Sequence, residues 1–376
     1  MPIEVESPEE LGYDTIRYNL SESSMRDATI GELGLHSPSL VDELSEKVLW
    51  YGDHRGDRGL RALVAELGES LSTDDVLITA GAAMALFMVH TAFLDPGDEI
   101  VVFHPNYATN IETPRAIGAN VLPLRLLFKD DYRPDLDRLE SLVSARTKIV
   151  SITDPHNPTG ICLNEDERAH LVALAERHGC LLLVDETYRE LSREPARPWA
   201  AEMSTSAISI SSLSKSMGLP GIRIGWAITR NPVYREQLLA AKEQMMICGS
   251  VLDEAVATHA LRQRAELMAV RRETADRHLS IVHGWMSGHA DLEWVEPQGG
   301  VVCFPRIRDP YAFDVAAFYH HLRTVGGTLV GAGHWFEVDT RSFRVGFGWP
   351  DERELRGGLQ AIDTSLDAAR VQRKSP

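Results

Sequence analysis

Seven short apolar runs, separated by stretches with helical spacing, constrain the fold of this chain more than any other feature. All lie between residues 75 and 230: DVLITAG, EIVVFH, NVLPLRL, KIVSITD, CLLLVDE, AISISS and GWAIT. Several are apolar on both faces, as expected for strands covered by helices on two sides. The stretch NEDERAHLVALAERHG between two of them has helical spacing and ends in Gly179, a suitable C-cap. The pattern predicts an α/β fold with a mostly parallel sheet between helices.

The rest of the chain predicts a second, smaller domain. With 376 residues, the chain is too long for one ordinary core and suits two lobes. Residues 235–285 have a long, charged, helical pattern, whereas 290–370 contain two strand patterns, GGVVCFPRI and SFRVGFGW, and a final helix. We therefore expect an N-terminal segment (1–45) packed on the small domain, a large domain (46–285) that includes a long linking helix, and a small C-terminal α+β domain (286–376).

Composition excludes some classes of function. The net charge of −17 argues against a nucleic-acid binder, which usually carries a basic face. Four scattered cysteines have no metal-ligand spacing, so we expect no metal site and a reduced, cytoplasmic protein. The longest nearly apolar run, AAMALFMVHTAFL, is too short to span a membrane and predicts a buried helix.

Small, polar or aromatic clusters follow five of the predicted strands. These clusters are AGAAMAL, HPNYATN, DPHNPTG, DETY and SLSK. Each alone could be a turn or a helix cap. In open α/β sheets, however, ligands bind just beyond the carboxyl ends of the strands. Five such clusters at one edge therefore predict a ligand site.

Part of this edge suits a phosphate. Small residues open the helix predicted after the first strand: Gly81, Ala82 and Ala83. They allow backbone N–H groups to approach an anion at the helix N-terminus. Ser212 and Ser214 offer hydroxyl groups to the same anion, and Arg223 offers a positive charge.

The remaining side chains suit a flat, charged ring. Tyr107 could lay its aromatic face on a ring, and Asp185 ends an apolar strand, where a buried carboxylate needs a cationic partner. Tyr188 and Asn157 could donate hydrogen bonds to a ring oxygen, and Lys215 is an amine nucleophile. A phosphate, a ring, a protonated ring nitrogen, a ring oxygen and an amine together describe pyridoxal 5′-phosphate bound to a lysine as a Schiff base.

These motifs resemble those of the class I/II aminotransferases, of the fold-type I pyridoxal-phosphate superfamily. SLSKSMGLPGIRIGW resembles the lysine segment of that family, DPHNPTG its Asn-Pro-Thr-Gly turn, and VDETY its Asp-x-x-Tyr element. The resemblance extends from YGDHRGDRGLRALVA to SFRVGFG, nearly the whole chain. It implies an aminotransferase that acts on a small-molecule amino acid and a keto acid, in specialised amino-acid metabolism.

The resemblance also implies roles for residues at the cofactor. Lys215 would be the Schiff-base lysine and proton carrier, Asp185 would pair with the pyridinium nitrogen, and Tyr188 and Asn157 would bind the ring oxygen. Tyr107 would stack on the ring. The phosphate would be bound by a further set: Ser212, Ser214, Arg223 and the backbone of Gly81, Ala82 and Ala83.

Two more residues carry implied roles farther from the ring. Tyr51 matches a tyrosine that reaches the phosphate across a dimer interface, which implies a homodimer with shared active sites. Arg344 matches the arginine that binds the substrate α-carboxylate, and a planar guanidinium suits that bidentate task. Asn157 would also contact substrate. From the residues alone, Tyr51 could instead be a core aromatic and Arg344 a surface arginine.

Two segments depart from the family pattern and leave the reaction type open. The N-terminal NLSESSMRDATIGEL and the GAGHWFE segment differ from the usual sequences. The former resembles capreomycidine-synthase-like enzymes, which act on arginine-derived amino acids. Glu22, Asp27 and Asp53 could face a cationic side chain or could be solvated surface acids. We expect transamination, with elimination or cyclisation on an arginine-like amino acid as the alternative; a DNA-binding regulator of this fold is the least expected reading.

Overall fold

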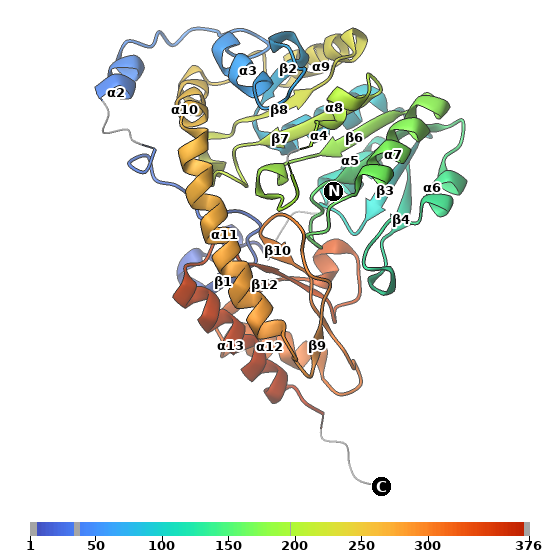
Figure 1. Ribbon diagram of the computed structural model, residues 1–376, viewed down its shortest axis with the longest axis vertical. Coiled ribbons are helices and arrows are strands. Elements are labelled where there is room, and N and C mark those ends of the chain that lie inside the picture. The colour runs from blue at the N-terminus through green and yellow to red at the C-terminus, as the bar shows by residue number, and fades with distance from the viewer. Residues whose placement is uncertain (1–5, 34–37, 196, 372–376) are drawn as a thin grey trace.

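A seven-stranded sheet forms the centre of the larger domain in the computed structural model, which describes residues 6–33, 38–195 and 197–371 (Figure 1). The predicted strand runs all form strands of this sheet, in the order β2-β8-β7-β6-β5-β3-β4. Their bounds are β2 Val76–Thr79, β3 Glu99–His104, β4 Asn120–Arg125, β5 Thr147–Thr153, β6 Leu181–Asp185, β7 Ala207–Ser212 and β8 Gly225–Ile228. Only β8 runs antiparallel to its neighbours, so the predicted, mostly parallel α/β sheet is confirmed.

Helices cover both faces of this sheet, which explains why the strand runs are apolar throughout. On β6, Leu181 and Leu183 pack into the core beneath α4 (Gly81–Phe93), α5 (Thr109–Ile117) and α9 (Pro232–Met245). Leu182 and Val184 alternate with them and pack into the core beneath α6 (Leu136–Leu142), α7 (Glu165–His178) and α8 (Ala200–Met203). Successive strand residues point to opposite faces, so a strand buried on both sides needs apolar residues at every position.

Helix α7 begins and ends as its sequence predicts. Asn164 accepts from the backbone N–H of Glu167, whose side chain accepts in return from the backbone N–H of Asn164, and this capping box satisfies two N-terminal donors. Gly179 ends the helix in the left-handed conformation (φ 64°, ψ 29°), which confirms the predicted C-cap.

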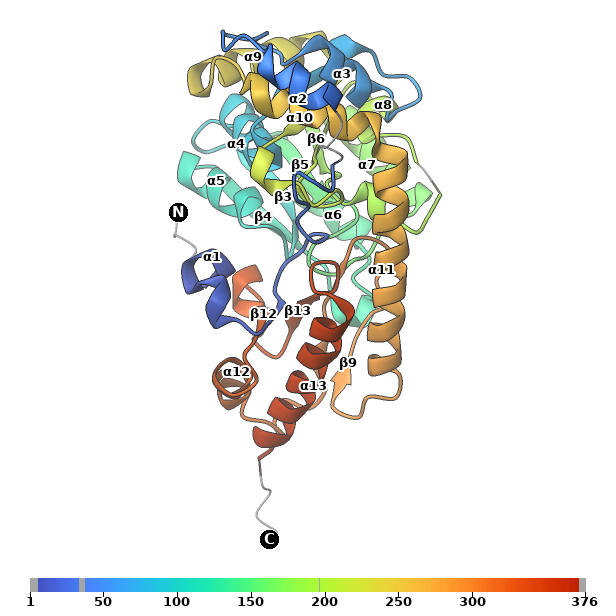
Figure 2. The ribbon, with the colours of Figure 1, turned by 90° about the vertical axis from the view of Figure 1, so that its left-hand side faces the viewer.

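The predicted long linking helix is three helices. After α9, residues 246–250 interrupt the pattern, and Ser250 caps the start of α10 (Val251–Arg262) by accepting from the backbone N–H of Asp253. Gln263 then separates α10 from α11 (Arg264–Met286). Helix α11 runs down from the large domain along the smaller one (Figure 2). Charged residues and helical spacing continue across both breaks, so the sequence pattern alone does not predict where the helices end.

A four-stranded sheet forms the smaller domain, in the order β1-β12-β13-β10. Its strands are β1 (Tyr18–Leu20), β12 (Thr328–Ala332), β13 (Phe343–Gly346) and β10 (Val302–Cys303). The N-terminal strand β1 pairs in parallel with β12, with Leu20 opposite Val330. Helices α12 (Val315–Thr324) and α13 (Glu352–Ala368) pack on this sheet. The segment GGVVCFPRI is not one strand: it is split at Phe304–Pro305 into β10 and β11 (Arg306–Ile307), and β11 pairs with β9 (Leu292–Glu293).

Two glycines bring α13 close to β1. A Cβ atom at Gly357 would lie 2.6 Å from the Tyr18 ring, and one at Gly358 would lie 2.6 Å from Cδ1 of Leu20. Since Cβ atoms do not approach other atoms so closely, any larger residue there would push the helix off the strand. The N-terminal strand is therefore fixed on the small domain by packing as well as by pairing.

The remaining elements are short. The helices are α1 (Pro8–Leu11), α2 (Pro38–Ser45) and α3 (Arg58–Ala65). The 3-10 helices are η1 (Tyr13–Thr15), η2 (Thr73–Asp75), η3 (Phe128–Asp130), η4 (Arg189–Leu191), η5 (Pro220–Ile222) and η6 (Gly333–Phe336). Within the described residues, no helix is both long and apolar enough to cross a membrane, and no group of three or more His, Cys, Asp or Glu side chains is arranged to hold a metal.

Candidate active site

A cleft of about 710 Å³ lies where the carboxyl ends of the large sheet face the small domain. The ends of β5, β6 and β7 contribute Thr153, Asp185 and Ser212, and the small domain contributes Arg344 of β13 and residues 21–23, which follow β1. Most residues that the sequence assigns to a site line this cleft: Ala82, Ala83, Tyr107, Asn157, Asp185, Tyr188, Ser212, Ser214, Lys215, Arg223 and Arg344. Residues that are far apart in the chain therefore meet at the strand ends, as the sequence predicts.

One end of the cleft is shaped for an anion. Gly81 opens α4 with φ +79°, and a Cβ atom there would lie 2.7 Å from Nη2 of Arg223. A Cβ at Gly225 would lie 2.8 Å from the backbone nitrogen of Ala82. These two glycines let the guanidinium lie against the N-terminus of a 13-residue helix, where free N–H groups and the helix dipole favour negative charge. A phosphate group fits this arrangement.

The floor of the cleft carries a buried carboxylate. Asp185 is only 6% exposed, and its Oδ1 accepts hydrogen bonds from Oγ1 of Thr187 at 2.5 Å and from the backbone nitrogen of Thr187 at 3.1 Å. Burial raises the pKa of Asp185, while these hydrogen bonds and the charge of Lys215 lower it. An ionised carboxylate in such a place needs a cationic partner. The protonated ring nitrogen of pyridoxal phosphate fits that requirement.

A second buried ionic group lies beneath the cleft and was not found from the sequence. Arg168 of α7 pairs with Asp154 at 3.2 Å and with Glu186 at 3.8 Å. Asp154 follows β5 and Glu186 follows β6, so the arginine ties the ends of two adjacent strands together. Burial raises the pKa of Asp154, and Arg168 opposes that shift. Removing one partner of such a group is costly because the others remain buried and charged.

Arg344 joins the two sides of the cleft. Its Nη1 donates to Oδ1 of Asn157 at 2.9 Å, and its Nη2 donates to the carbonyl oxygen of Ser21 at 2.5 Å. The residue is only 8% exposed, so the alternative of a surface arginine is wrong. Tyr188 is also buried. Burial raises the pKa of Tyr188 to about 12, although a hydrogen bond with Ser23 acts in the opposite direction.

Tyr51 does not line the cleft of its own chain. Its side chain is 78% exposed, so it is not a core aromatic. Two other acids were considered with Glu22 as partners of a cationic side chain, and they lie outside the cleft. Asp53 pairs with Arg61 at 3.2 Å, and Asp27 accepts a hydrogen bond from Nε1 of Trp349 at 3.1 Å. Of these acids, only Glu22 lines the cleft.

The N-terminal segment contributes groups that sequence reasoning missed. Glu9, in α1, lines the cleft together with Glu22. The hydroxyl oxygen of Tyr13 lies 3.1 Å from Oε1 of Glu9 and 3.3 Å from Oε1 of Glu22. Burial raises the pKa of Glu22, whereas Lys215 and Arg344 lower it. Two acidic side chains, Glu9 and Glu22, therefore line this part of the cleft.

Other missed residues lie inside the motifs themselves. Oδ1 of Asn106 accepts from the backbone nitrogen of Tyr107 at 2.7 Å and from Oγ1 of Thr153 at 3.1 Å, so it fixes the start of the tyrosine loop against β5. His334 and Trp335, from the unusual GAGHWFE segment, line the cleft from the small domain and bind Glu6. Asn106 and Thr153 could have been found from the sequence, because both lie where a predicted strand ends. No local sequence pattern marks His334 and Trp335.

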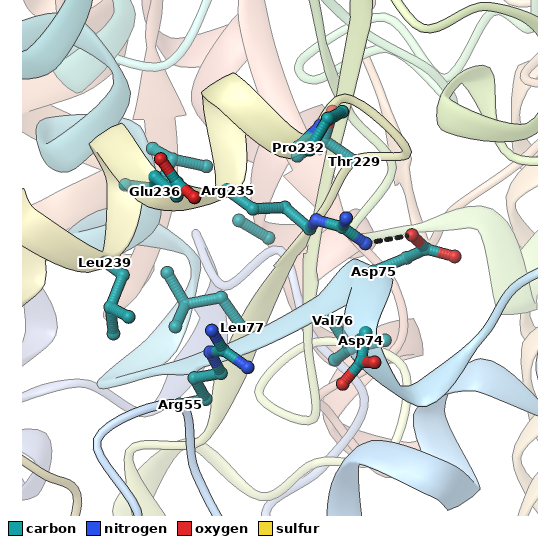
Figure 3. Close-up of a pocket in the computed structure, with 12 residues that line it drawn as sticks. Arg55, Asp74, Asp75, Val76, Leu77, Thr229, Pro232, Arg235, Glu236 and Leu239 are labelled. Carbon is teal, nitrogen blue, oxygen red and sulfur yellow. Dashed lines mark hydrogen bonds and ion pairs between the residues drawn. The ribbon is translucent and has the colours of Figure 1, made fainter.

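A second hollow, between β2 and α9, does not compete with the cleft as a site (Figure 3). It is smaller, about 210 Å³, and contains no candidate nucleophile. One of its arginines, Arg235, already pairs with Asp75 at 2.8 Å (Figure 3).

Comparison with known proteins agrees with this geometry. The family model "Aminotransferase class I and II" matches residues 18–362. Capreomycidine synthase of Streptomyces vinaceus is 32% identical over 360 residues, 94% of this chain and 91% of that protein. Arginine–pyruvate transaminase of Pseudomonas aeruginosa is 30% identical, over 79% of this chain and 77% of that protein. The structure of a PLP-dependent aminotransferase from Streptococcus suis superposes with a TM-score of 0.91 and 27% identity, over 99% and 100% of the two chains. The chain therefore belongs to the class I and II aminotransferases and is a PLP-dependent transferase.

Proposed function

We propose that this enzyme transfers the amino group of an amino acid with a cationic side chain to a keto acid. The observation that carries this proposal is that Lys215, Asp185 and Arg344 line one cleft, so an amine, a buried carboxylate and a guanidinium surround the same space. Arg344 suits the α-carboxylate of the substrate. The acids Glu9 and Glu22 suit a positive charge at the other end of the substrate, and the relative named arginine–pyruvate transaminase supports that choice.

Each residue has a separate task in this proposal. Pyridoxal phosphate, when bound, supplies the electron sink that stabilises negative charge at the substrate Cα. Asp185 keeps the ring nitrogen protonated, and Tyr188 and Asn157 orient the ring oxygen. Lys215 would take the proton from Cα and hold it between Cα and the cofactor, and one water would then hydrolyse the C=N bond, so that the substrate would leave as a keto acid and its nitrogen would stay with the cofactor. A second keto acid then receives that nitrogen.

The experiment is a single half-reaction. Enzyme loaded with pyridoxal phosphate is incubated with arginine, ornithine, lysine, glutamate or alanine, without any keto acid. We expect about one equivalent of keto acid per active site from a cationic substrate, with the substrate nitrogen recovered on the cofactor. The variant Lys215→Ala is the control and should give none. An amino-acid product that keeps its nitrogen contradicts transamination.

Elimination with ring closure is the second candidate, and the similarity to capreomycidine synthase favours it. Both reactions begin with removal of the Cα proton by Lys215 and then diverge. In elimination, a leaving group departs from the carbon next to Cα, and the amino group is never transferred. Glu22 lies in the cleft with a raised pKa, so it can be protonated and can donate a proton to a departing hydroxyl. Mass spectrometry after incubation with hydroxyarginine distinguishes the two: a dehydrated or cyclic amino acid supports this candidate.

We also propose a homodimer in which Tyr51 contributes to the active site of the partner. Val48, Leu49, Trp50 and Tyr51 form an apolar stretch that is 68–78% exposed in the single chain. Exposed apolar stretches of this kind mark interfaces. The occupant we propose is a second copy of this chain, because the family resemblance implies a phosphate-binding role for Tyr51, and Tyr51 does not line the cleft of its own chain.

A further inference from the structure

Among the described residues, both hydrogen bonds to the side-chain carboxylate of Asp185 go to one oxygen, and both come from Thr187. The hydroxyl of Thr187 lies 2.5 Å from Oδ1 and its backbone nitrogen 3.1 Å from the same atom. Both residues are buried, and both line the cleft. These two hydrogen bonds therefore fix the orientation of the carboxylate and leave its Oδ2 available to another partner.

Thr187 is itself fixed by the lysine segment. Its carbonyl oxygen accepts from the hydroxyl of Ser216 at 3.1 Å, and Ser216 directly follows Lys215. The threonine thus lies between the carboxylate and the segment that carries the nucleophile. Two charged groups also act on Asp185: Glu186 disfavours its charge and Lys215 favours it. Burial and, to a lesser extent, the charge of Asp185 raise the pKa of Tyr188.

We infer that Thr187 is a positioning residue, whose hydroxyl keeps Asp185 ionised and turns Oδ2 toward the ring nitrogen of pyridoxal phosphate. The inference rests on the role proposed for Asp185. A hydrogen bond to an ionised acceptor is stronger than one between neutral groups, and it stabilises the charged form against burial. Without the hydroxyl, Asp185 would keep the backbone hydrogen bond but would take up a proton at higher pH.

The test uses Thr187→Val, which removes the hydroxyl while it keeps the shape of the side chain, and Thr187→Ser, which restores the hydroxyl. Thr229→Val is the matched control, because Thr229 is equally buried and its hydroxyl donates to the carbonyl of Ala207 at 3.0 Å, outside the cleft. Each protein is loaded with pyridoxal phosphate labelled with ¹⁵N in the ring. The ¹⁵N chemical shift, measured against pH, reports whether the ring nitrogen is protonated.

We expect Thr187→Val to lose ring protonation, and the acid limb of kcat/KM to move up by about one to two pH units. Thr187→Ser and Thr229→Val should behave as the wild type. A wild-type ¹⁵N titration in Thr187→Val overturns the inference. If that variant does not fold, Thr187→Ala is used with the same criteria.

Asp185→Asn separates the inference from the role on which it rests. If this variant loses ring protonation while Thr187→Val and Thr187→Ala do not, the role of Asp185 stands and that of Thr187 fails. If Asp185→Asn leaves the ¹⁵N shift unchanged, both fail.

Discussion

Arg344 of the small sheet donates a hydrogen bond of 2.9 Å to Oδ1 of Asn157, in the loop that follows β5 of the large sheet. This contact joins the residue proposed to bind substrate to a residue proposed to bind the cofactor. A carboxylate that binds Arg344 would therefore be placed at a fixed distance from the ring. Under this proposal, both the affinity for substrate and the position of its Cα would depend on this one guanidinium.

Arg344→Lys keeps the charge but loses the planar fork. We expect kcat/KM to fall by about 10- to 100-fold, mainly through KM, because a bidentate hydrogen-bonded pair becomes a single contact. Steady-state kinetics with the substrate of the half-reaction check this, and Arg341→Lys, outside the cleft, is the control. Cofactor content should not change in either variant. An unchanged KM would show that the carboxylate binds elsewhere.

Asp185→Asn should bind the cofactor but turn over on the order of 10²–10⁴-fold more slowly, because a neutral amide cannot keep the ring nitrogen protonated. The rate of a single half-reaction, followed by absorbance of the cofactor, measures this loss. Near-normal turnover would mean that another group is the partner of the ring nitrogen.

Lys215 should carry the cofactor. Borohydride reduction of the loaded enzyme, followed by peptide mapping, should find the pyridoxyl group on Lys215. The relevant comparison is Lys242, which is fully buried but donates a hydrogen bond to the carbonyl oxygen of His54 at 2.6 Å. A label on Lys242, or on any other lysine, contradicts the assignment.

Glu22→Gln should change the choice of substrate. We expect KM for arginine to rise by about 10-fold, because a charged hydrogen bond is lost, and KM for alanine to stay constant. Glu10→Gln, an exposed acid of the same segment, is the control. An equal change in KM for arginine and alanine would show that Glu22 does not recognise the side chain of the substrate.

The carboxyl group of Glu22 should also make the stability of the protein depend on pH. Burial raises the pKa of Glu22 above that of an unfolded glutamate, so ionisation of Glu22 costs stability. The wild type should therefore be as stable as Glu22→Gln at a pH below the unfolded pKa and should lose stability relative to it as the pH rises through the shifted pKa. Thermal unfolding of both proteins against pH measures this difference. A saturating cationic substrate should reduce it.

Mixing two chains that are each impaired in a different way tests the shared site. In a heterodimer of Tyr51→Phe and Lys215→Ala, one site would combine both defects and the other would have neither. At limiting pyridoxal phosphate, the mixture should therefore exceed the activity of either parent, since loss of one hydrogen bond to phosphate lowers affinity by about 10-fold. No gain on mixing, or a monomer in sedimentation, contradicts the proposal.

The sequence predicted the large domain and its ligand edge well because both follow from local pattern. Strands such as β6 need apolar residues on both faces, and Asp185 and Ser212 lie directly where such strands end. The short strands were harder: β1 has three residues, and only its partner β12 makes it a strand. Glu9 was missed because it reaches the cleft only through tertiary folding of the N-terminal segment, and Tyr13 was missed because folding brings it against Glu9 and Glu22. Thr187 was inside a quoted motif, but nothing in the sequence reveals its hydrogen bond to the neighbouring carboxylate.

The pairing of β1 with β12, and of β12 with β13, has a consequence for how selectivity could change. Glu22 follows β1 and Arg344 lies on β13, so both proposed contacts to the substrate extend from the small sheet, while Asp185 and Lys215 lie at the ends of the large sheet. The segment after β1 is also bonded to the lysine segment, because the backbone N–H groups of Met25 and Ala28 donate to the carbonyl oxygens of Lys215 and Gly218 at 2.9 and 2.8 Å. Recognition and chemistry are thus coupled, and an exchange of residues 18–30 between relatives would redirect the enzyme only if the new segment keeps these two backbone hydrogen bonds.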